Sequence, residues 1–186
     1  TPDVWDILFG TMGAILSFLI ITNLHSSEFE TKKKIKLIEA FKSNYDSINC
    51  IKAIPYDGID VVLNYLAIRG YEVYIATNKR NIPTLKIINH LGWLGKFRAI
   101  YTIDLKDSFF KDKASMVQEM METESINSAN TYLVGDSLDD YFAAKQNNLK
   151  FLMASWGYGG KKMGNLQQVT LKEPSEIIEF LNTHNG

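Results

Sequence analysis

From Ile54 onward the chain alternates regularly between short β-rich apolar runs and amphipathic helical segments. The expected strands are 72–76, 99–103, 131–134 and 150–154, and the expected helices are 59–69, 83–92, 113–122, 139–146 and 174–182. Short connections between alternating strands and helices indicate βαβ units, which build a parallel sheet. The sequence therefore predicts an α/β fold: a doubly wound, Rossmann-like parallel sheet flanked by helices.

The first part of the chain has a different pattern, and we expect it to form a separate N-terminal segment, 1–50, before an α/β core at 51–186. Its apolar run Ile7–Ile21 is 15 residues long, whereas a spanning helix needs about 20 apolar residues. Asp3 and Asp6 make the start acidic, unlike the basic leader of a secretory signal. We therefore expect a buried segment and no membrane anchor.

Composition narrows the class of protein further. The 186 residues are 46% hydrophobic and 22% charged, as in an ordinary globular domain, with a formal net charge of −1. Such a weak net charge gives no strong field for nucleic acid or for an anionic membrane. Cys50 is the single cysteine, so no internal disulfide can form, and a reducing cytoplasm is the expected location.

Two carboxylates follow the predicted strand 131–134 at a spacing of four residues. Asp136 follows the strand after one glycine, and Asp140 lies in the first turn of the next helix. Ligands of doubly wound sheets bind at the carboxyl ends of the strands, so these side chains can converge on one hard cation. Mg²⁺ is the expected ion, because it takes few carboxylates together with waters and phosphate oxygens. Asp139 is interpreted only as an acidic residue that favours a helix N-terminus.

Two further polar clusters are candidates for binding phosphate. Thr77 and Asn78 follow the predicted strand 72–76, where a hydroxyl and free backbone N–H groups can hold a phosphate. Lys113 opens a predicted helix, where its charge can neutralise phosphate. Lys111 lies two positions earlier in the same cluster.

The order of these clusters resembles motifs II, III and IV of the haloacid dehalogenase-like (HAD) hydrolases. The matching residues are Thr77-Asn78-Lys79, then Lys113, then Gly135–Asp140. Other stretches are similar to the phosphoglycolate-phosphatase subgroup: Pro55–Gly58 with Gly70-Tyr71, Ala143-Ala144, and Trp156–Gly159. The resemblance covers roughly residues 36–160.

The resemblance implies a Mg²⁺-dependent phosphatase that acts on a small phosphorylated metabolite. Thr77 would hydrogen-bond the phosphoryl oxygens, with Asn78 beside it in the phosphate site. Lys113 would stabilise the charge on the nucleophile and the phosphate. Lys111 is the alternative, since either lysine can be placed against the family's lysine, and Lys113 is preferred because it directly precedes the apolar stripe of the helix. Asp136 would bind Mg²⁺, and Asp140 would hold the ion directly or through a water.

The family's motif I, an apolar strand ending in Asp-x-Asp, has no match in residues 1–50. Its first aspartate is the nucleophile and its second is the general acid/base. In one interpretation, residues 1–50 resemble the later half of a helical cap and motif I lies upstream of Thr1, in agreement with the lack of an initiating Met. In the other, Leu16–Thr22 is the central first strand, and Asn23 and His25 replace the two aspartates in a degenerate site. A physical objection weighs against the first interpretation: without the central strand of motif I, two inner strands of the sheet would be left unpaired.

Three functions are compatible with these features. The leading hypothesis is a phosphomonoester hydrolase with an aspartyl-phosphate mechanism. Its rival is a catalytically inactive binding module that keeps the metal and phosphate cradle. A flavodoxin-like or receiver-like domain shares the architecture, but it would not require Lys113 and Asp140 together. The sequence specifies neither the substrate nor the oligomeric state.

Overall fold

The computed structural model describes residue 36 and residues 53–105, 109–159 and 168–184. The chain divides into two compact units, 1–47 and 48–186, and all described residues except Lys36 belong to the second. The apolar run Ile7–Ile21 and the candidate residues Asn23 and His25 lie outside the described residues. The division of the chain into a cap-like segment and a core therefore stays a prediction.

Helices and strands alternate along the described part of the chain, as the sequence predicts. In chain order they are α4 (Ile59–Ile68), β1 (Tyr74–Thr77), α5 (Asn81–His90), β2 (Ala99–Thr102), α6 (Lys113–Thr123), the 3₁₀ helix η2 (Ser128–Asn130), β3 (Tyr132–Gly135), α7 (Leu138–Gln146), β4 (Lys150–Ala154), β5 (Val169–Leu171) and α8 (Glu176–His184). The α/β prediction is confirmed. The sequence analysis missed β5, which has only three residues and forms through its pairing with β4.

The described strands form two parallel sheets, with the orders β1-β2 and β3-β4-β5. Thr77 pairs with Thr102 in the first sheet, and Gly135 pairs with Met153 in the second. Within the described ranges, β1 pairs only with β2, and β3 pairs only with β4. Each of these two strands therefore has one edge whose backbone N–H and C=O groups meet no strand there. Val134 of β3 is an apolar residue, yet it is 41% exposed.

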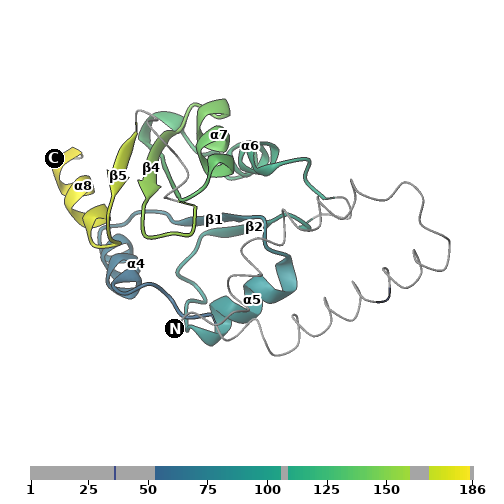
Figure 1. Cartoon of the computed structure of the whole chain (residues 1–186), viewed down its shortest axis with the longest axis horizontal. Helices are drawn as coiled ribbons and strands as arrows, with labels where there is room; N and C mark the ends of the chain where they lie inside the picture. The colour runs from purple at the N-terminus through teal and green to yellow at the C-terminus, as the bar shows by residue number, and fades with distance from the viewer. Residues whose placement is uncertain (1–35, 37–52, 106–108, 160–167, 185–186) are drawn as a thin grey trace. The chain divides into compact units, whose positions relative to one another are not determined.

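Helices cover both faces of the strands, which makes the fold doubly wound (Figure 1). On one face α6 and α7 pack together, and Val117 and Ala144 are fully buried in their core with Phe151 of β4 against them. On the other face Leu152 of β4 lies in a core that includes Leu181 of α8. Neighbouring strand residues point to opposite faces, so Phe151 and Leu152 belong to different cores. No helix in the described ranges is long and apolar enough to cross a membrane.

The start of α5 differs from the prediction. Pro83 was expected at the first helical position, but the helix begins at Asn81. The cause is Asp104, whose Oδ1 accepts a hydrogen bond of 2.7 Å from the Asn81 backbone N–H and so adds residues to the first turn. Pro83 is tolerated at the third position because N–H groups in the first turn have no partner within the helix.

A capping box fixes the start of α6, the helix that carries Lys113. The Asp112 side chain accepts a hydrogen bond of 2.8 Å from the Ser115 backbone N–H, and the Ser115 side chain lies against the Asp112 backbone in return. These hydrogen bonds from Ser115 are the main cause that lowers the pKa of Asp112 from its ordinary value of 3.8. The cap thus holds Lys113 at a defined helix start.

The substitution Leu152→Ala tests the core of the second sheet. Leu152 is 2% exposed, so removing its side chain should lower the free energy of unfolding by about 2–5 kcal/mol. Urea unfolding followed by circular dichroism would measure it. Leu94→Ala is the matched control, because Leu94 is 62% exposed and its loss should change stability little. Equal effects of the two substitutions would contradict the described packing.

The cap of α6 predicts a pH dependence. The folded state lowers the pKa of Asp112, so its ionised form contributes stability above pH 3.8, and this contribution is lost as the pH falls through the lowered folded value. Asp112→Ala should therefore cost about 1 kcal/mol at neutral pH and less in acid. Thermal unfolding at several pH values would measure this. A constant difference between the two proteins across the acid range would contradict it.

Candidate active site

Asp140 organises the loop between β3 and α7. Its Oδ2 accepts hydrogen bonds from Ser137 Oγ at 2.6 Å and from the backbone N–H groups of Ser137 and Asp136 at 3.1 and 3.2 Å. The Asp140 N–H donates to Ser137 Oγ at 3.2 Å, which completes a capping box at the start of α7. A Cβ on Gly135 would lie 2.4 Å from Asp140 Cβ, so only glycine fits at that position. The loop that carries Asp136 is therefore fixed by one carboxylate, and Asp140 is only 7% exposed.

The other oxygen of this carboxylate binds Lys113. Lys113 Nζ lies 2.5 Å from Asp140 Oδ1, and the two side chains are 12% and 9% exposed. The ion pair joins the start of α6 to the first turn of α7. The structure therefore places Lys113 against the loop, whereas Lys111 is exposed and forms no salt bridge with a described residue.

The segment after β4 closes over Asp136. The Gly159 N–H donates to Asp136 Oδ2 at 3.1 Å. A Cβ on Gly157 would lie 2.3 Å from this same oxygen, and one on Gly159 would lie 2.2 Å from the Asp136 carbonyl oxygen. Both positions require glycine because the backbone passes so close to the aspartate. The sequence analysis noted this stretch without giving it a role, although two glycines just after a strand are a signal of close backbone approach.

The end of β1 lies next to the start of α7. Thr77 Oγ1 accepts a hydrogen bond of 3.1 Å from the Lys79 N–H, and its own O–H has no acceptor among the described residues. Asn78 Nδ2 makes a long contact of 3.5 Å with Asp139 Oδ2. The three clusters expected from the sequence thus converge, and Asp139 has a contact that its place in the sequence did not indicate.

Tyr56 is a neighbour of Asp136 that the sequence analysis did not identify as a site residue. Burial is the main cause that raises the pKa of the Tyr56 phenol above its ordinary value, followed by the charges of Tyr158 and Asp136. The phenol therefore stays protonated at neutral pH and can donate a hydrogen bond near Asp136. Both tyrosines remain partly open to solvent, with Tyr56 41% and Tyr158 67% exposed.

Asp136 is the described residue best placed to hold a metal ion. Its Oδ1 accepts no hydrogen bond from a described residue, whereas both oxygens of Asp140 are occupied. No group of three or more His, Cys, Asp or Glu side chains in the described ranges could hold a metal. Mg²⁺ takes one or two carboxylates together with waters and phosphate oxygens, so Asp136 fits such an ion.

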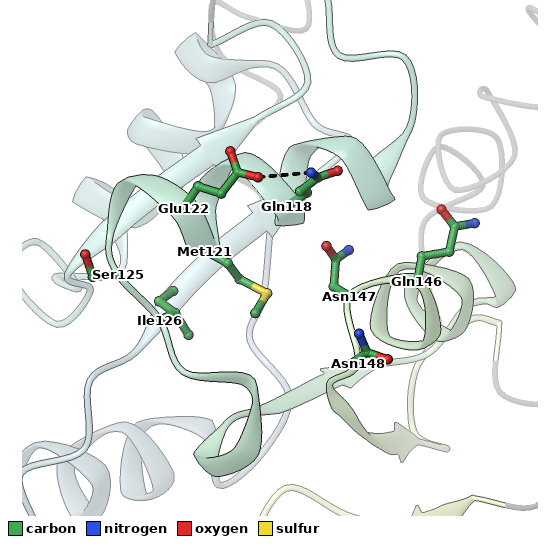
Figure 2. Close-up of a pocket in the computed structure, with 8 residues that line it drawn as sticks. All are labelled: Gln118, Met121, Glu122, Ser125, Ile126, Gln146, Asn147 and Asn148. Carbon is green, nitrogen blue, oxygen red and sulfur yellow. Dashed lines mark hydrogen bonds between the residues drawn. The ribbon is translucent and has the colours of Figure 1, made fainter.

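Two cavities flank α6 and α7 at different ends. Figure 2 shows the larger, of about 550 Å³, which lies at the C-terminal ends of both helices and is lined mostly by polar side chains; none of the predicted site residues lines it. The smaller, of about 290 Å³, is lined by Asn78 and Lys113 among others. Of the three side chains expected to bind phosphate, Asn78 and Lys113 therefore line the smaller cavity and Thr77 does not.

Asp140→Ala tests the ion pair. It would leave the buried Lys113 charge unpaired and remove the acceptor for the loop N–H groups, so we expect a loss of about 3–5 kcal/mol in the free energy of unfolding. Chemical denaturation would measure this loss. Asp139→Ala is the neighbouring control, because Asp139 is exposed and should cost less than about 1 kcal/mol. A small effect of Asp140→Ala would contradict its structural role.

Comparison with known proteins identifies the family to which the chain is similar. The model of the family described as "Haloacid dehalogenase-like hydrolase" matches residues 18–154. A 5'-nucleotidase of Pseudomonas aeruginosa is 26% identical over 72% of this chain and 60% of its own length. A phosphoglycolate phosphatase of Aquifex aeolicus is 26% identical over 82% of this chain and 71% of its own. A phosphoglycolate phosphatase of Psychrobacter arcticus is 29% identical over 77% and 63%.

The chain thus spans about 60 to 71% of the length of these curated relatives. Among solved structures, a haloacid dehalogenase-like family protein of Streptococcus pneumoniae superposes with a TM-score of 0.71 at 19% identity, covering 84% of this chain and 72% of that one. A HAD-superfamily hydrolase of Geobacter sulfurreducens has a TM-score of 0.65 at 18% identity, covering 86% and 77%. These structures share the fold, and the family model matches most of the sequence. The chain therefore belongs to the haloacid dehalogenase-like hydrolase family.

Proposed function

We propose that the protein is a Mg²⁺-dependent phosphomonoester hydrolase that acts on a small phosphorylated metabolite through an aspartyl-phosphate. The observation that carries the proposal is the buried Lys113–Asp140 pair set against the loop of Asp136, at the carboxyl end of β3. The names of the relatives support it, since 5'-nucleotidase and phosphoglycolate phosphatase both denote phosphomonoester hydrolases.

Four described residues would each have a separate role in binding the phosphoryl group and its metal ion. Asp136 would hold Mg²⁺ through Oδ1, and the bound ion would stabilise charge on the phosphoryl oxygens. The O–H of Thr77, which has no acceptor among the described residues, and the amide of Asn78 would donate to those oxygens. Lys113 would balance the negative charge from a fixed position. We assign Asp140 the task of orienting Lys113 and the loop, because its oxygens already have donors.

The nucleophile must come from outside the described residues. A strand that pairs with the edges of β1 and β3 that have no partner among the described residues would bring its carboxyl end between Thr77 and Asp136, where an aspartate could attack phosphorus. Motif I upstream of Thr1 would supply this aspartate. The alternative strand Leu16–Thr22 leads to Asn23, whose amide cannot form an aspartyl-phosphate.

A second candidate function is a binding module that retains the cradle without turnover. The observation that favours it is the lack of an Asp-x-Asp in residues 1–50. Such a protein would bind Mg²⁺ and a phosphate ester at Asp136 and Lys113 but would not release phosphate.

Hydrolysis of p-nitrophenyl phosphate by the 186-residue chain separates the two functions. For the hydrolase we expect turnover that requires Mg²⁺, stops with EDTA and falls at least about 100-fold in Asp136→Asn, since the metal carboxylate acts in the transition state. Glu179→Gln removes the same charge from the exposed face of α8 and should leave the rate unchanged.

Two other outcomes of this assay would contradict parts of the proposal. Mg²⁺-dependent phosphate binding without turnover, measured by calorimetry and lost in Asp136→Asn, would support the binding module and contradict hydrolysis by this chain. Turnover that survives Asp136→Asn would contradict the assignment of the metal site.

A further inference from the structure

Thr102, the last residue of β2, has a buried hydroxyl group without a hydrogen-bond partner. The residue is 0% exposed, and its Oγ1 meets no donor or acceptor among the described residues. A buried hydroxyl normally has a partner, because without one it loses the hydration that it had in the unfolded chain. Gln168 Oε1 is the other such atom in the described ranges, but the amide nitrogen of that side chain contacts Met153 Sδ at 3.2 Å. The fold alone therefore does not account for a hydroxyl at position 102.

Thr102 lies next to Thr77, the residue expected to donate to the phosphoryl oxygens. The two residues are paired in the parallel sheet of β1 and β2, and paired residues of neighbouring strands point to the same face. The residues before them, Ala76 and Tyr101, belong to the core on the opposite face. Both threonines end their strands and so lie at the carboxyl edge of the sheet, where ligands of doubly wound folds bind. The hydroxyl without a partner thus belongs to the strand neighbour of the candidate phosphate donor.

The hydrogen bonds of Thr77 leave one acceptor position open among the described residues. A hydroxyl has one O–H to donate and two lone pairs to accept. Thr77 Oγ1 accepts the Lys79 N–H at 3.1 Å, which uses one lone pair. The second can accept the O–H of Thr102 after a rotation about χ1 of either threonine, since the staggered rotamers place the oxygen at different positions. Both lone pairs of Thr77 would then be occupied, and its own O–H would be left to donate to a phosphoryl oxygen.

We propose that Thr102 is a positioning residue of the phosphate site, whose O–H donates to Thr77 Oγ1 when a phosphoryl group is bound and thereby directs the Thr77 O–H at that group. This inference rests on the proposed function, because it takes Thr77 as a phosphate donor. The structure shows no hydrogen bond between the two hydroxyls. Forming it together with the phosphate complex would therefore add to the affinity for phosphate, although Thr102 itself touches neither the phosphoryl group nor the metal ion.

Two substitutions at Thr102 separate the effect of its hydroxyl from that of its methyl group. Thr102→Val removes only the hydroxyl, so the urea midpoint of unfolding should stay unchanged or rise, because no hydrogen bond is lost. The same variant should weaken the Mg²⁺-dependent binding of inorganic phosphate by the full chain about three- to tenfold, as for the loss of one hydrogen bond. Thr102→Ser keeps the hydroxyl and removes a buried methyl group, so it should lower the midpoint and retain the affinity. Calorimetric titration and urea unfolding measure the two quantities.

Thr84→Val is the matched control, because Thr84 is a buried threonine whose hydroxyl already has a partner. It is 5% exposed, and its O–H donates to the Arg80 carbonyl oxygen at 2.7 Å. Its substitution should lower the urea midpoint and leave phosphate affinity unchanged.

A double variant tests whether Thr102 acts through Thr77. Thr77→Val combined with Thr102→Val should bind phosphate no more weakly than Thr77→Val alone, since the second hydroxyl has lost its acceptor. A further loss in the double variant would overturn the inference. So would an unchanged affinity in Thr102→Val, an equal loss in Thr102→Ser, or a lower urea midpoint in Thr102→Val. If wild type binds no phosphate with Mg²⁺, or Thr77→Val binds it as tightly as wild type, the proposed phosphate site fails and this inference fails with it.

Discussion

One buried carboxylate joins the elements on which the candidate site depends. Asp140 holds Lys113 with one oxygen and three donors of the Asp136–Ser137 loop with the other, so its position couples α6, α7 and the end of β3. A buried charge is tolerated only when its lone pairs are satisfied, and here the donors belong to Ser137 and to two candidate site residues, Lys113 and Asp136. The same interaction therefore stabilises the fold and orients the site.

Glycines set how closely the backbone approaches that carboxylate and its neighbour. Gly135 leaves room for Asp140, while Gly157 and Gly159 let the segment after β4 pass against Asp136. One oxygen of Asp136 is thereby bound by a backbone N–H, and the other accepts no hydrogen bond from a described residue. Helix capping by Asp112 adds a further constraint, because it fixes where α6 begins and hence where Lys113 and Lys111 lie.

β1 and β3 each have one edge without a partner strand among the described residues, and this bears on where the nucleophile lies. Asn78 after β1 contacts Asp139 at the start of α7, yet neither β1 nor β3 has a second strand partner among the described residues. Inner edges of parallel sheets are normally paired, because unpaired backbone groups favour strand addition. A strand that pairs with both edges would complete the sheet and bring its carboxyl end to the site.

The sequence by itself determined the α/β class and the order of nearly all elements, and it predicted which residues form the candidate site. Those features follow from local periodicity and from motifs at strand ends, which a linear pattern can encode. It missed β5, whose three residues are too few for a pattern, and misplaced the start of α5, which Asp104 sets from 23 positions away. The pairing of Lys113 with Asp140 and the closing of Gly157 and Gly159 over Asp136 were decided by the tertiary structure alone, because each depends on groups that only packing brings together.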